Sequence, residues 1–347
     1  MTAALFDVLE GGLLTTIQDR GRLDWAHLGV PESGAADPWS SAVANLLVGN
    51  DLMAAVLEMT LVGPVLAVRP GVAVSVGLAG ADLGARIRGG RRLAAGRSHR
   101  LAPGDVLELT GDAGDRRTSG ARAYLAVPDG IDAPIVLGSR STCLAAGFGG
   151  LDGRPLRSGD LISSGTSASR IVGPELVWPD DADLVLQTRS IASDSPGAHE
   201  AEPRTLRVIG GPAHGLERLA EIDWRVGAAS DRVGARLEAD HVPDGIGGEI
   251  ATQGVPWGTI QIPPDGRPII LGADHQSTGG YRIVGVVISA DRPVLGQLRP
   301  GARVRLAPTD RATALAALRA QQDALLAGAA AIRDAAGWGA LVDSAGG

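Results

Sequence analysis

The sequence has 347 residues, of which 44% are hydrophobic and only 3% aromatic, with 50 glycines, 21 prolines and a formal net charge of −7. The length favours two domains, and the glycine, proline and aliphatic content favours short strands joined by tight turns. The acidic balance argues against a nucleic-acid-binding scaffold. All 32 basic residues are arginines, which excludes a Schiff-base lysine, a P-loop lysine and a biotinylated lysine.

The cysteine and histidine content narrows the chemistry further. The single cysteine, Cys143, excludes an intramolecular disulfide and fits a reducing, cytoplasmic setting. No apolar run reaches the ~20 residues of a membrane-spanning helix, and Asp7 and Glu10 stand where a signal peptide would need basic residues. The six histidines show no metal-ligand spacing, so we predict no metal site in the protein itself.

The first polar constellation follows a predicted short strand, Leu13 to Ile17, with Gln18, Asp19, Arg20 and Arg22 at its end. Turns at residues 29–34 lead to a helix over 38–48, with Asp37 as N-cap, Pro38 at the first position and Gly49 as the stop. Arginines, an acid and a helix N-terminus are the parts of a carboxylate or phosphate site. The alternative is a surface Asp19–Arg22 pair and a simple helix cap.

The rest of the first half is predicted to be β-rich. Alternation of Val72, Val74 and Val76 indicates a half-buried strand, and residues 99–109 indicate a strand pair hinged at Pro103–Gly104. A strand at 124–127 leaves Ser139 and Arg140 near a strand end. The Leu-x-Pro-Gly pattern returns at 298–306, which suggests two domains closed by similar hairpins.

Composition also sets the predicted domain limits. Residues 178–204 are rich in Pro, Ser, Asp and Glu and form the predicted linker between β domains at 1–177 and 205–308. Beyond these, residues 309–347 form a helix and tail, with Asp310 as N-cap and an apolar face of Leu315, Leu318, Gln322, Leu325 and Ile332. We expect this helix to pack on a domain or a partner.

A second polar constellation lies in the second half. Ser230-Asp231-Arg232 predicts an Asx-type turn that presents an arginine. A buried strand at 268–271 is followed by a polar, glycine-rich loop that runs from Asp274 to Tyr281, whose backbone N–H groups could line an anion site. The alternative is an ordinary hairpin with a polar loop.

These residue types suit a reaction on a small, polar, acylated substrate. Asp19 and Asp274 could act as a base or hold Mg²⁺, while arginines grip carboxylate or phosphate groups. His275 could be an acid or base, although a lone histidine is more often structural. Nucleophilic catalysis has weak support, because Cys143 has no neighbouring histidine and no Gly-x-Ser-x-Gly motif occurs.

Several stretches resemble the bacterial family of the 5-oxoprolinase C subunit, which is also called allophanate hydrolase subunit 2. The matching motifs run in order from about residue 12 to 306: TTIQDRGR, GVPESGAAD, ANLLVGN, LGSRST, GFGGLDGRPLRSGD, SDRVGARL, GTIQIPPDGRPIILGADHQSTGGY and QLRPGARVRL. The sequence is also similar to the carboxyltransferase region of urea carboxylase and to the antagonist of a sporulation kinase inhibitor.

The resemblance implies a mainly β fold of two cyclophilin-like β-barrel domains with a site in the cleft between them. It implies a partner protein, the B subunit of the same complex, together with a third protein for 5-oxoprolinase, the A subunit. The implied reaction is ATP-dependent opening of 5-oxo-L-proline to L-glutamate, through phosphorylation of the lactam and its hydrolysis. ATP is the implied cofactor, and Mg²⁺ would accompany it.

The resemblance also carries over site residues, motif by motif. The implied catalytic residues are Asp19, Arg22 and Asp274. The implied binding residues are Arg20, Ser33, Asn45, Asn50, Ser139, Arg140, Asp231, Arg232, Gln261, Thr278, Gly279, Gly280 and Tyr281.

Departures from the family pattern bear on the choice of activity. Arg282 and Ile283 stand where the family commonly has proline and urea carboxylases often have lysine, and Ala213 replaces a usual glutamine. These differences weaken the urea-carboxylase interpretation most. Two alternatives to 5-oxoprolinase stay open: a carboxyltransferase acting on urea or another small amide, and a non-catalytic antagonist that binds a kinase inhibitor related to the B subunit.

Overall fold

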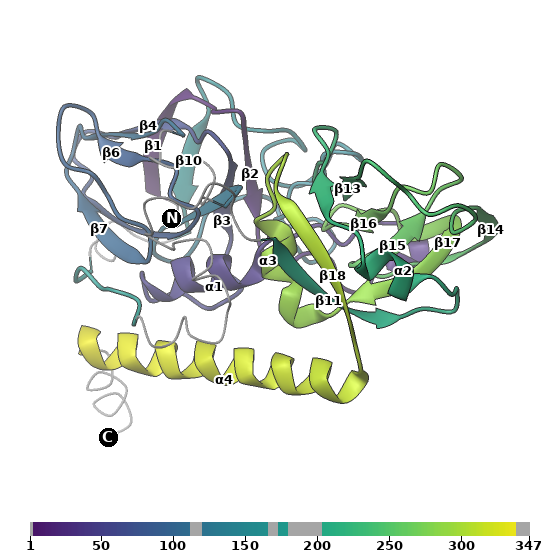
Figure 1. The fold of residues 1–347 in the computed structure, drawn as a ribbon. Coiled ribbons are helices and arrows are strands. Elements are labelled where there is room, and N and C mark those ends of the chain that lie inside the picture. Colours follow the sequence, from purple (N-terminus) through teal and green to yellow (C-terminus); the bar gives the residue numbers. More distant parts are fainter. Residues whose placement is uncertain (1–2, 112–119, 166–172, 180–202, 338–347) are drawn as a thin grey trace.

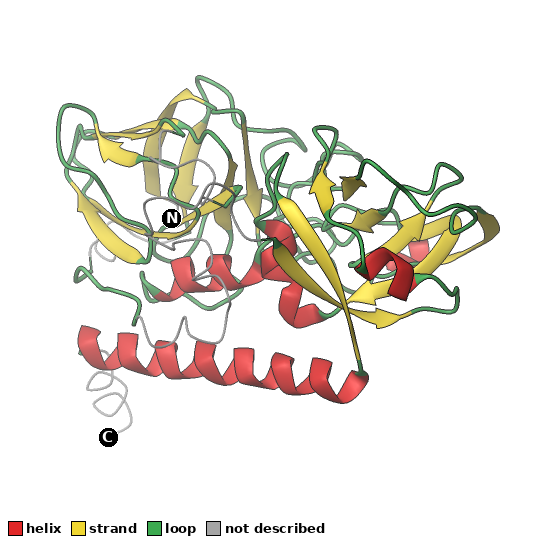
Figure 2. Ribbon diagram, viewed as in Figure 1, coloured by secondary structure: helices red, strands yellow, loops and turns green. Residues whose placement is uncertain are grey.

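The computed structural model describes residues 3–111, 120–165, 173–179 and 203–337. Two β-rich halves lie side by side, and one long helix, α4 (Arg311–Ala336), runs along both of them (Figure 1). The other helices are short (Figure 2). The prediction of a mainly β protein with a few helices is therefore confirmed.

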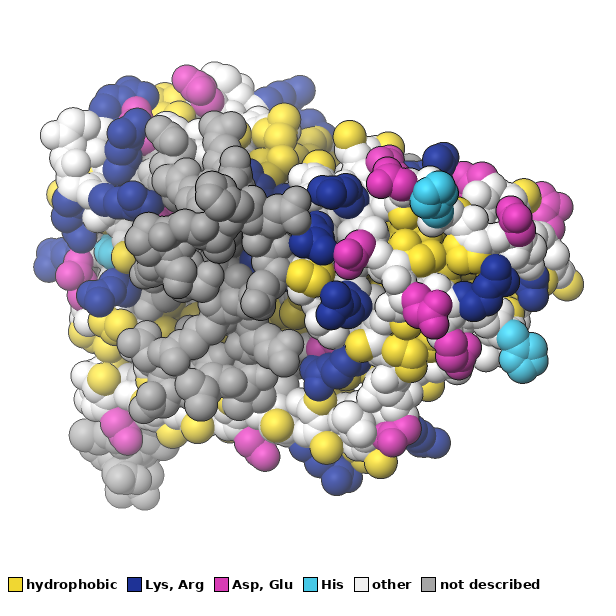
Figure 3. All heavy atoms as spheres, viewed as in Figure 1, with side chains coloured by type: hydrophobic (Ala, Val, Ile, Leu, Met, Phe, Trp, Pro, Cys, Tyr) yellow, Lys and Arg dark blue, Asp and Glu magenta, His cyan; other side chains and the backbone are white. Residues whose placement is uncertain are grey.

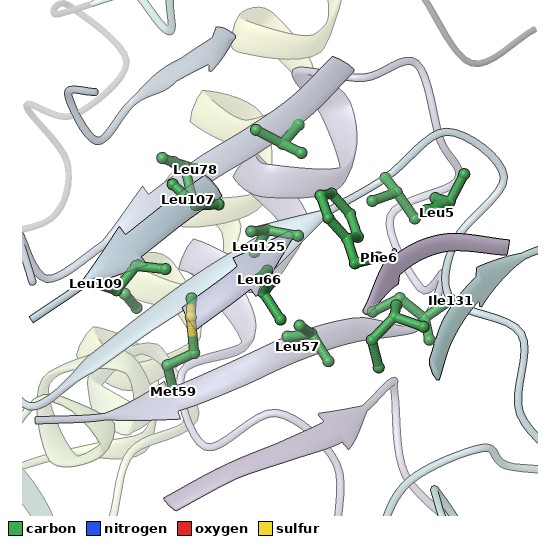
Figure 4. Close-up of a cluster of buried hydrophobic side chains, with 14 of the residues drawn as sticks. Leu5, Phe6, Leu57, Met59, Leu66, Leu78, Leu107, Leu109, Leu125 and Ile131 are labelled. Carbon is green, nitrogen blue, oxygen red and sulfur yellow. The ribbon is translucent and has the colours of Figure 1, made fainter. Parts of the chain in front are cut away.

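The first half consists of two five-stranded sheets around one apolar core. One sheet has the order β10-β1-β4-β8-β6 and the other β2-β3-β9-β5-β7. Side chains from both sheets meet in this core, among them Phe6, Leu57, Met59, Leu66 and Leu125 (Figure 4). The strands are β1 (Ala3–Glu10), β2 (Leu14–Gln18), β3 (Val56–Thr60), β4 (Val65–Val68), β5 (Val74–Gly80), β6 (Ala85–Ile87), β7 (Arg97–Leu101), β8 (Val106–Leu109), β9 (Arg122–Ala126) and β10 (Leu161–Ser164).

Strand β5 is buried on both faces, and the prediction of a half-buried strand here is wrong. Val74 and Val76 are fully buried in the core, and the other face is covered by helix α1 (Pro38–Leu46). A Cβ atom on Gly77 would lie 2.2 Å from the Ala44 carbonyl oxygen, so glycine allows the helix to approach the strand. The helix itself begins as predicted, because the Asp37 side chain accepts a hydrogen bond from the Ser40 backbone N–H.

The second half is a closed ring of seven strands with one added edge strand. Strand β11 pairs in parallel with β18 and antiparallel with β17, which closes the order β11-β18-β12-β13-β16-β15-β17, and β14 extends β17. Leu206, Trp224, Ile260 and Val304 fill its core. The elements are β11 (Arg204–Gly210), α2 (Leu216–Ala220), β12 (Trp224–Val226), β13 (Gly234–Glu238), β14 (Glu249–Gly254), β15 (Thr259–Ile262), β16 (Ile269–Leu271), β17 (Thr278–Val287), η5 (Ser289–Asp291), α3 (Arg292–Gly296) and β18 (Arg303–Thr309); the 3-10 turn η1 (Ala26–Leu28) belongs to the first half.

The two Leu-x-Pro-Gly segments do not form hairpins, contrary to the prediction. Strand β7 pairs with β5 in one sheet, whereas β8 pairs with β4 and β6 in the other, so the turn at Pro103–Gly104 carries the chain between sheets. In the second copy, residues 298–302 connect α3 to β18 and are not a strand. The shared pattern marks a turn that precedes a strand, not a hairpin.

Helix α4 packs on its own chain, and the predicted face is confirmed in part. Ile332 is buried and Leu318 and Leu325 are half-buried, while Leu315 and Gln322 are exposed; the other buried residues are Ala324, Gly328 and Ala329. A Cβ atom on Gly328 would lie 2.2 Å from the Trp178 ring, which itself meets Trp39 edge-on at 6.1 Å. The small residues of α4 therefore determine which of its faces packs on the first half, because they let the Trp178 indole approach the helix axis.

We predict that Gly328→Leu lowers the free energy of unfolding by about 1–3 kcal/mol, since the larger side chain must displace Trp178. Leucine has the higher helix propensity, so a purely local effect would have the opposite sign. Urea unfolding measures the change. Ala327→Leu, at the exposed preceding position, is the control and should be nearly neutral or stabilising.

The predicted domain limits and the two cyclophilin-like barrels stay predictions. Most of the predicted linker, residues 180–202, and the tail beyond 337 lie outside the described residues, as does His199. Strand β11 begins at Arg204, one residue before the predicted start of the second domain. Within the described residues, no helix is long and apolar enough to cross a membrane.

Candidate functional site

A buried ionic network centred on Arg232 joins the two halves. Its Nε and Nη2 atoms donate to the two Asp274 carboxylate oxygens at 2.8 and 2.9 Å, and Nη2 also donates to the Gly34 carbonyl at 2.8 Å. Its Nη1 donates to Glu58 of strand β3. Arg232 sits where predicted, behind an Asx turn in which Asp231 Oδ1 accepts from the Val233 N–H at 2.9 Å. The predicted arginine is thus presented to the opposite half.

Sequence reasoning missed the first-half members of this network, Glu58 and Arg122. Glu58 Oε2 accepts from the Ala36 N–H at 2.7 Å and from the Tyr124 hydroxyl at 2.8 Å, and Arg122 Nε lies 3.6 Å from Oε1. Burial favours neutral Arg232, but the neighbouring Asp274 and Glu58 carboxylates outweigh it and raise the pKa of Arg232 above its ordinary value. Burial and the Glu58 charge raise the pKa of Tyr124 well above 10.0.

Surface ion pairs contrast with this network. Arginine and acidic side chains are interspersed over the second half on the face shown in Figure 3. Exposed pairs such as Arg305–Asp223, at 3.9 Å, contribute little because water screens them. In the buried Arg232 network, water cannot replace a lost ion-pair partner. The charges of this network therefore fix the position of one half relative to the other.

The N-terminus of α1 is closed, so the prediction that it attracts an anion is wrong. The Asp37 carboxyl group already occupies this position, and it is buried. Its Oδ2 accepts from Gln297 Nε2 at 2.7 Å and from the Ser40 hydroxyl at 2.6 Å. Burial raises the pKa of Asp37, and the hydrogen bonds from Gln297 and Ser40 oppose that shift. The helix end is therefore a contact between the halves, and the position that an anion would take is occupied by the Asp37 carboxyl group.

Asp19 organises the loop at the end of β2. Its Oδ1 accepts from the Ser139 hydroxyl at 2.5 Å, the Ser141 hydroxyl at 2.6 Å and the Gly21 N–H at 2.9 Å, while Oδ2 accepts from the Arg140 N–H at 2.6 Å. The predicted residues Asp19, Ser139 and Arg140 are therefore brought together from positions 120 residues apart. Four donors occupy a carboxylate that offers about four acceptor positions.

Arg22 is buried beneath Phe148, whose ring centroid is 4.7 Å from the guanidinium carbon. Its Nη2 and Nε donate to the carbonyls of Ser141 at 2.6 Å and Val136 at 3.1 Å, and Nη1 has no hydrogen-bond partner among the described residues. Burial lowers the pKa of Arg22, and nearby Cys143 and Asp19 oppose this. Its contacts tie the 136–148 segment to the end of β2.

The segment 29–35 links the Asp19 loop to the second half. Ser33 has a positive φ of 56° and donates its N–H to the Ala273 carbonyl at 2.9 Å, while the Ala35 N–H donates to the Asp19 carbonyl at 3.0 Å. The predicted site segments 19–22, 33–35 and 273–275 therefore meet at the boundary between the halves. Because these three segments meet at the boundary between the halves, we take that boundary as the candidate site.

Residues 278–281 are the start of strand β17, so the prediction of a loop is wrong here. Gln253 and Gly254 of β14 pair with Gly279 and Thr278, so these backbone groups belong to a ladder and do not form an anion nest. Gln261 lies beside them, buried, with Nε2 unpartnered among the described residues. A Cβ atom on Gly279 would lie 2.1 Å from that nitrogen, so any larger residue there would displace the Gln261 amide group. Thr278 and Tyr281 remain exposed at the strand start.

Two further predicted residues, Asn45 and Asn50, lie away from this boundary and hold a turn. Asn45 Nδ2 donates to the Ala54 carbonyl at 2.8 Å, and Asn50 Nδ2 donates to Asn45 Oδ1 at 2.9 Å and to the Val127 carbonyl at 2.8 Å. Asn50 Oδ1 accepts from the Asp129 N–H at 2.7 Å. These bonds fix the chain between α1 and β3 to the segment that follows β9.

His275 is a titratable group at the boundary that has no ion-pair partner among the described residues. It is buried, and its Nδ1 lies 2.7 Å from the Gln276 carbonyl, so a neutral ring carries its proton on Nδ1 and keeps Nε2 as an acceptor. Burial lowers its pKa from 6.5, while Gln276 and Glu32 oppose the shift. Arg292 stacks on Trp257, with its guanidinium carbon 4.6 Å from the ring centroid. No sequence pattern predicts this contact.

Burial of His275 and His99 predicts a pH-dependent stability. Both imidazoles have a pKa lowered from 6.5, first by burial, so the unfolded chain takes up protons near pH 6.5 while the folded chain resists them. The free energy of unfolding should therefore fall as the pH drops below about 6.5, by at most about 1.4 kcal/mol per histidine and pH unit. Urea unfolding at pH 7.0 and 5.5 measures it. The double variant His99→Gln/His275→Gln should flatten the profile, whereas exposed His214→Gln should not; equal slopes in all three proteins would refute this cause.

No group of three or more His, Cys, Asp or Glu side chains that could hold a metal ion occurs in the described part of the chain. The two predicted carboxylates, Asp19 and Asp274, are instead engaged by internal donors. The fold and the boundary region thus define a two-part β protein whose candidate site lies where its halves meet.

Comparison with known proteins identifies the family of this chain. The model of the family "carboxyltransferase domain, subdomain A and B" matches residues 28–308. The 5-oxoprolinase C subunit of Escherichia coli (strain K12) is 32% identical over 318 residues, which cover 92% of this chain and 96% of that protein. The crystal structure of TTHA0988 is 33% identical with a TM-score of 0.73, covering 88% of this chain and 55% of that one. The K. lactis urea amidolyase structure is 25% identical with a TM-score of 0.76, covering 94% and 20%.

The chain belongs to this carboxyltransferase family, which it shares with the C subunit of 5-oxoprolinase. It spans about half of TTHA0988 and a fifth of the urea amidolyase chain. Of these relatives, one is named as a subunit of 5-oxoprolinase and one as a urea amidolyase.

Proposed function

We propose that this chain is the C subunit of an ATP-dependent 5-oxoprolinase, which opens 5-oxo-L-proline to L-glutamate together with the A and B subunits in the cytoplasm. The observation that carries the proposal is the 32% identity with the E. coli 5-oxoprolinase C subunit over nearly the full length of both proteins. That relative is matched end to end, whereas the urea amidolyase is matched over only a fifth of its length.

The internal contacts of the predicted catalytic side chains support the proposal that this chain is active only together with partner proteins. All three are engaged: Asp19 by four donors, Asp274 by Arg232, and Arg22 beneath Phe148. In this proposal they position the loops at the boundary between the halves. Groups that can still receive a substrate are exposed Arg20, which has no hydrogen-bond or ion-pair partner among the described residues, and His275 Nε2.

Arg20 is suited to hold the carboxylate of 5-oxoproline, because a guanidinium offers two parallel donors to a carboxylate. His275, neutral near pH 7, is suited to accept a proton from attacking water. For ATP, the N-terminus of α1 does not fit, because the Asp37 carboxyl group and Gln297 occupy it. We therefore assign the nucleotide and its Mg²⁺ to a surface shared with the B subunit.

The experiment is co-purification of this chain with the A and B subunits, followed by measurement of ADP release with and without 5-oxo-L-proline. We expect substrate-stimulated ADP and glutamate release that needs all three proteins. Arg20→Ala should lower kcat/KM by at least about tenfold, corresponding to ~1.4 kcal/mol of transition-state binding. Arg319→Ala, exposed on α4, is the control. A complex that forms without any 5-oxoproline-dependent turnover would refute the proposal.

A second candidate is a carboxyltransferase acting on urea or another small amide, favoured by the similarity to urea amidolyase at a TM-score of 0.76. This function predicts carboxyl transfer from carboxybiotin on a partner protein. Carboxyl transfer to urea by the co-purified complex, without 5-oxoproline-dependent ADP release, would support the carboxyltransferase function over the 5-oxoprolinase function.

A further inference from the structure

A cavity of about 290 Å³ opens between the two halves, away from the Asp19 loop and the start of β17. Leu14 and Leu61 of the first half face Val226 and Leu298 of the second half across it. Among the site residues predicted from sequence, only Asp231 and Arg232 line this cavity. The cavity adjoins the boundary region through Arg232 and Ala273, but Arg20 and His275, which are assigned above to 5-oxoproline, do not line it.

The size and walls of the cavity match a small-ligand site. Such sites are concave and mostly apolar, with a few polar groups that fix orientation, and about 300 Å³ is the lower end of their range. An apolar cavity of this kind selects a compact ligand with an apolar body. It is too small for a nucleotide to be its natural occupant.

Arg122 is the polar group in the wall with unused donors. It is buried, yet of its guanidinium nitrogens only Nη1 donates a hydrogen bond within the described residues, to the Gly296 carbonyl, and Nε has no hydrogen-bond partner there. Arg232, by comparison, donates from all three of its guanidinium nitrogens. A buried guanidinium with unmade hydrogen bonds carries a desolvation cost that an acceptor from outside would relieve.

Glu58 does not fill this role for Arg122. Its oxygens already accept from the Ala36 N–H, the Tyr124 hydroxyl and Arg232, and its Oε1 stays 3.6 Å from Arg122 Nε, beyond a hydrogen bond. Asp231, at the exposed rim, is turned to its own backbone, where Oδ1 accepts from the Val233 and Gly234 N–H groups. Arg122 can therefore pair with an incoming carboxylate.

We propose that this cavity binds a small monocarboxylate with an apolar body, its carboxylate on Arg122 and its body against the leucine and valine walls. The bound molecule would contact both halves at once. Arg122 neighbours Glu58, and Glu58 accepts a hydrogen bond from Arg232. Occupancy of the cavity would therefore affect the ionic network that ends at Asp274, one residue before His275.

Calorimetric titration of the purified full chain with hexanoate, against hexanamide as the uncharged analogue, tests the proposal. We expect saturable 1:1 binding of hexanoate, at least tenfold tighter than hexanamide, and a loss of at least tenfold in affinity in Arg122→Gln. Should Arg122→Gln fail to fold, Ala228→Trp is the decisive variant: Ala228 is exposed and lines the cavity, so tryptophan blocks its mouth.

The matched control is Ala229→Trp, which adds the same side chain at an exposed neighbour outside the cavity lining and should leave binding unchanged. Equal affinity for hexanoate and hexanamide, no saturable binding, or unchanged binding in Ala228→Trp would each overturn the proposal. The titration needs neither partner proteins nor turnover, so its outcome is independent of the 5-oxoprolinase assignment.

Discussion

Replacement of Arg232 by methionine is expected to lower the free energy of unfolding by about 3–5 kcal/mol. The substitution keeps apolar bulk but leaves Asp274 as a buried carboxylate without its cation and leaves Glu58 with Arg122 alone, at 3.6 Å, and an uncompensated buried charge is strongly destabilising. It also removes the hydrogen bond to the Gly34 carbonyl that holds the segment leading into α1. Urea unfolding followed by tryptophan fluorescence measures the loss.

Arg236→Met is the matched control, because Arg236 lies four residues further along the chain, on β13, with an exposed side chain. Its stability should change by less than about 0.5 kcal/mol. The triple variant Glu58→Gln/Arg232→Met/Asp274→Asn should regain much of the lost stability, since both unpaired carboxylates are gone and Arg122, whose side chain is 10% exposed, is the one charge of the network that remains. A triple variant no more stable than Arg232→Met would show that packing, not charge, causes the loss.

Removal of the Asp19 carboxylate is the second large effect. In Asp19→Ala the Ser139 and Ser141 hydroxyls and the Gly21 and Arg140 N–H groups lose a charged acceptor, and each such hydrogen bond contributes roughly 1.5–3 kcal/mol. Because these bonds are not additive, we expect a total loss of about 3–5 kcal/mol. Thermal and urea unfolding of the isolated chain give the value.

Asp19→Asn separates acceptor geometry from charge and should cost less than alanine, since its carbonyl oxygen can still accept from two donors. Asp24→Ala, at an exposed residue of the same loop, should be nearly neutral. If alanine and asparagine both leave stability unchanged but abolish turnover of the reconstituted complex, Asp19 acts on substrate and is not a positioning residue.

The features that were predicted well from sequence are those with local causes. The caps Asp37 and Asp310 and the Asx turn at Asp231 each depend on a side chain and a backbone N–H two or three residues away. The strand at 13–17 and the buried strand at 268–271 likewise follow from short apolar runs. The resemblance then indicated which segments would gather at the site.

What could not be predicted depends on partners far along the chain. Glu58 meets Arg232 across 174 residues, and nothing near Glu58 signals that its partner lies in the other half. The burial of β5 on both faces depends on α1 lying over it, which an alternating valine pattern does not encode. The glycines of the Thr278–Tyr281 stretch favour a loop, yet pairing with β14 makes it a strand.

The parallel pairing of β11 with β18 has a consequence for how the protein is made. Leu206 lies opposite Leu306, so the first strand of the ring waits for about a hundred further residues of synthesis before its parallel neighbour exists. Until then the ring is an open sheet whose apolar side chains and free strand edge are exposed on the nascent chain. Closure is a long-range step and correspondingly slow, so this half is where chaperone dependence and aggregation during expression should concentrate.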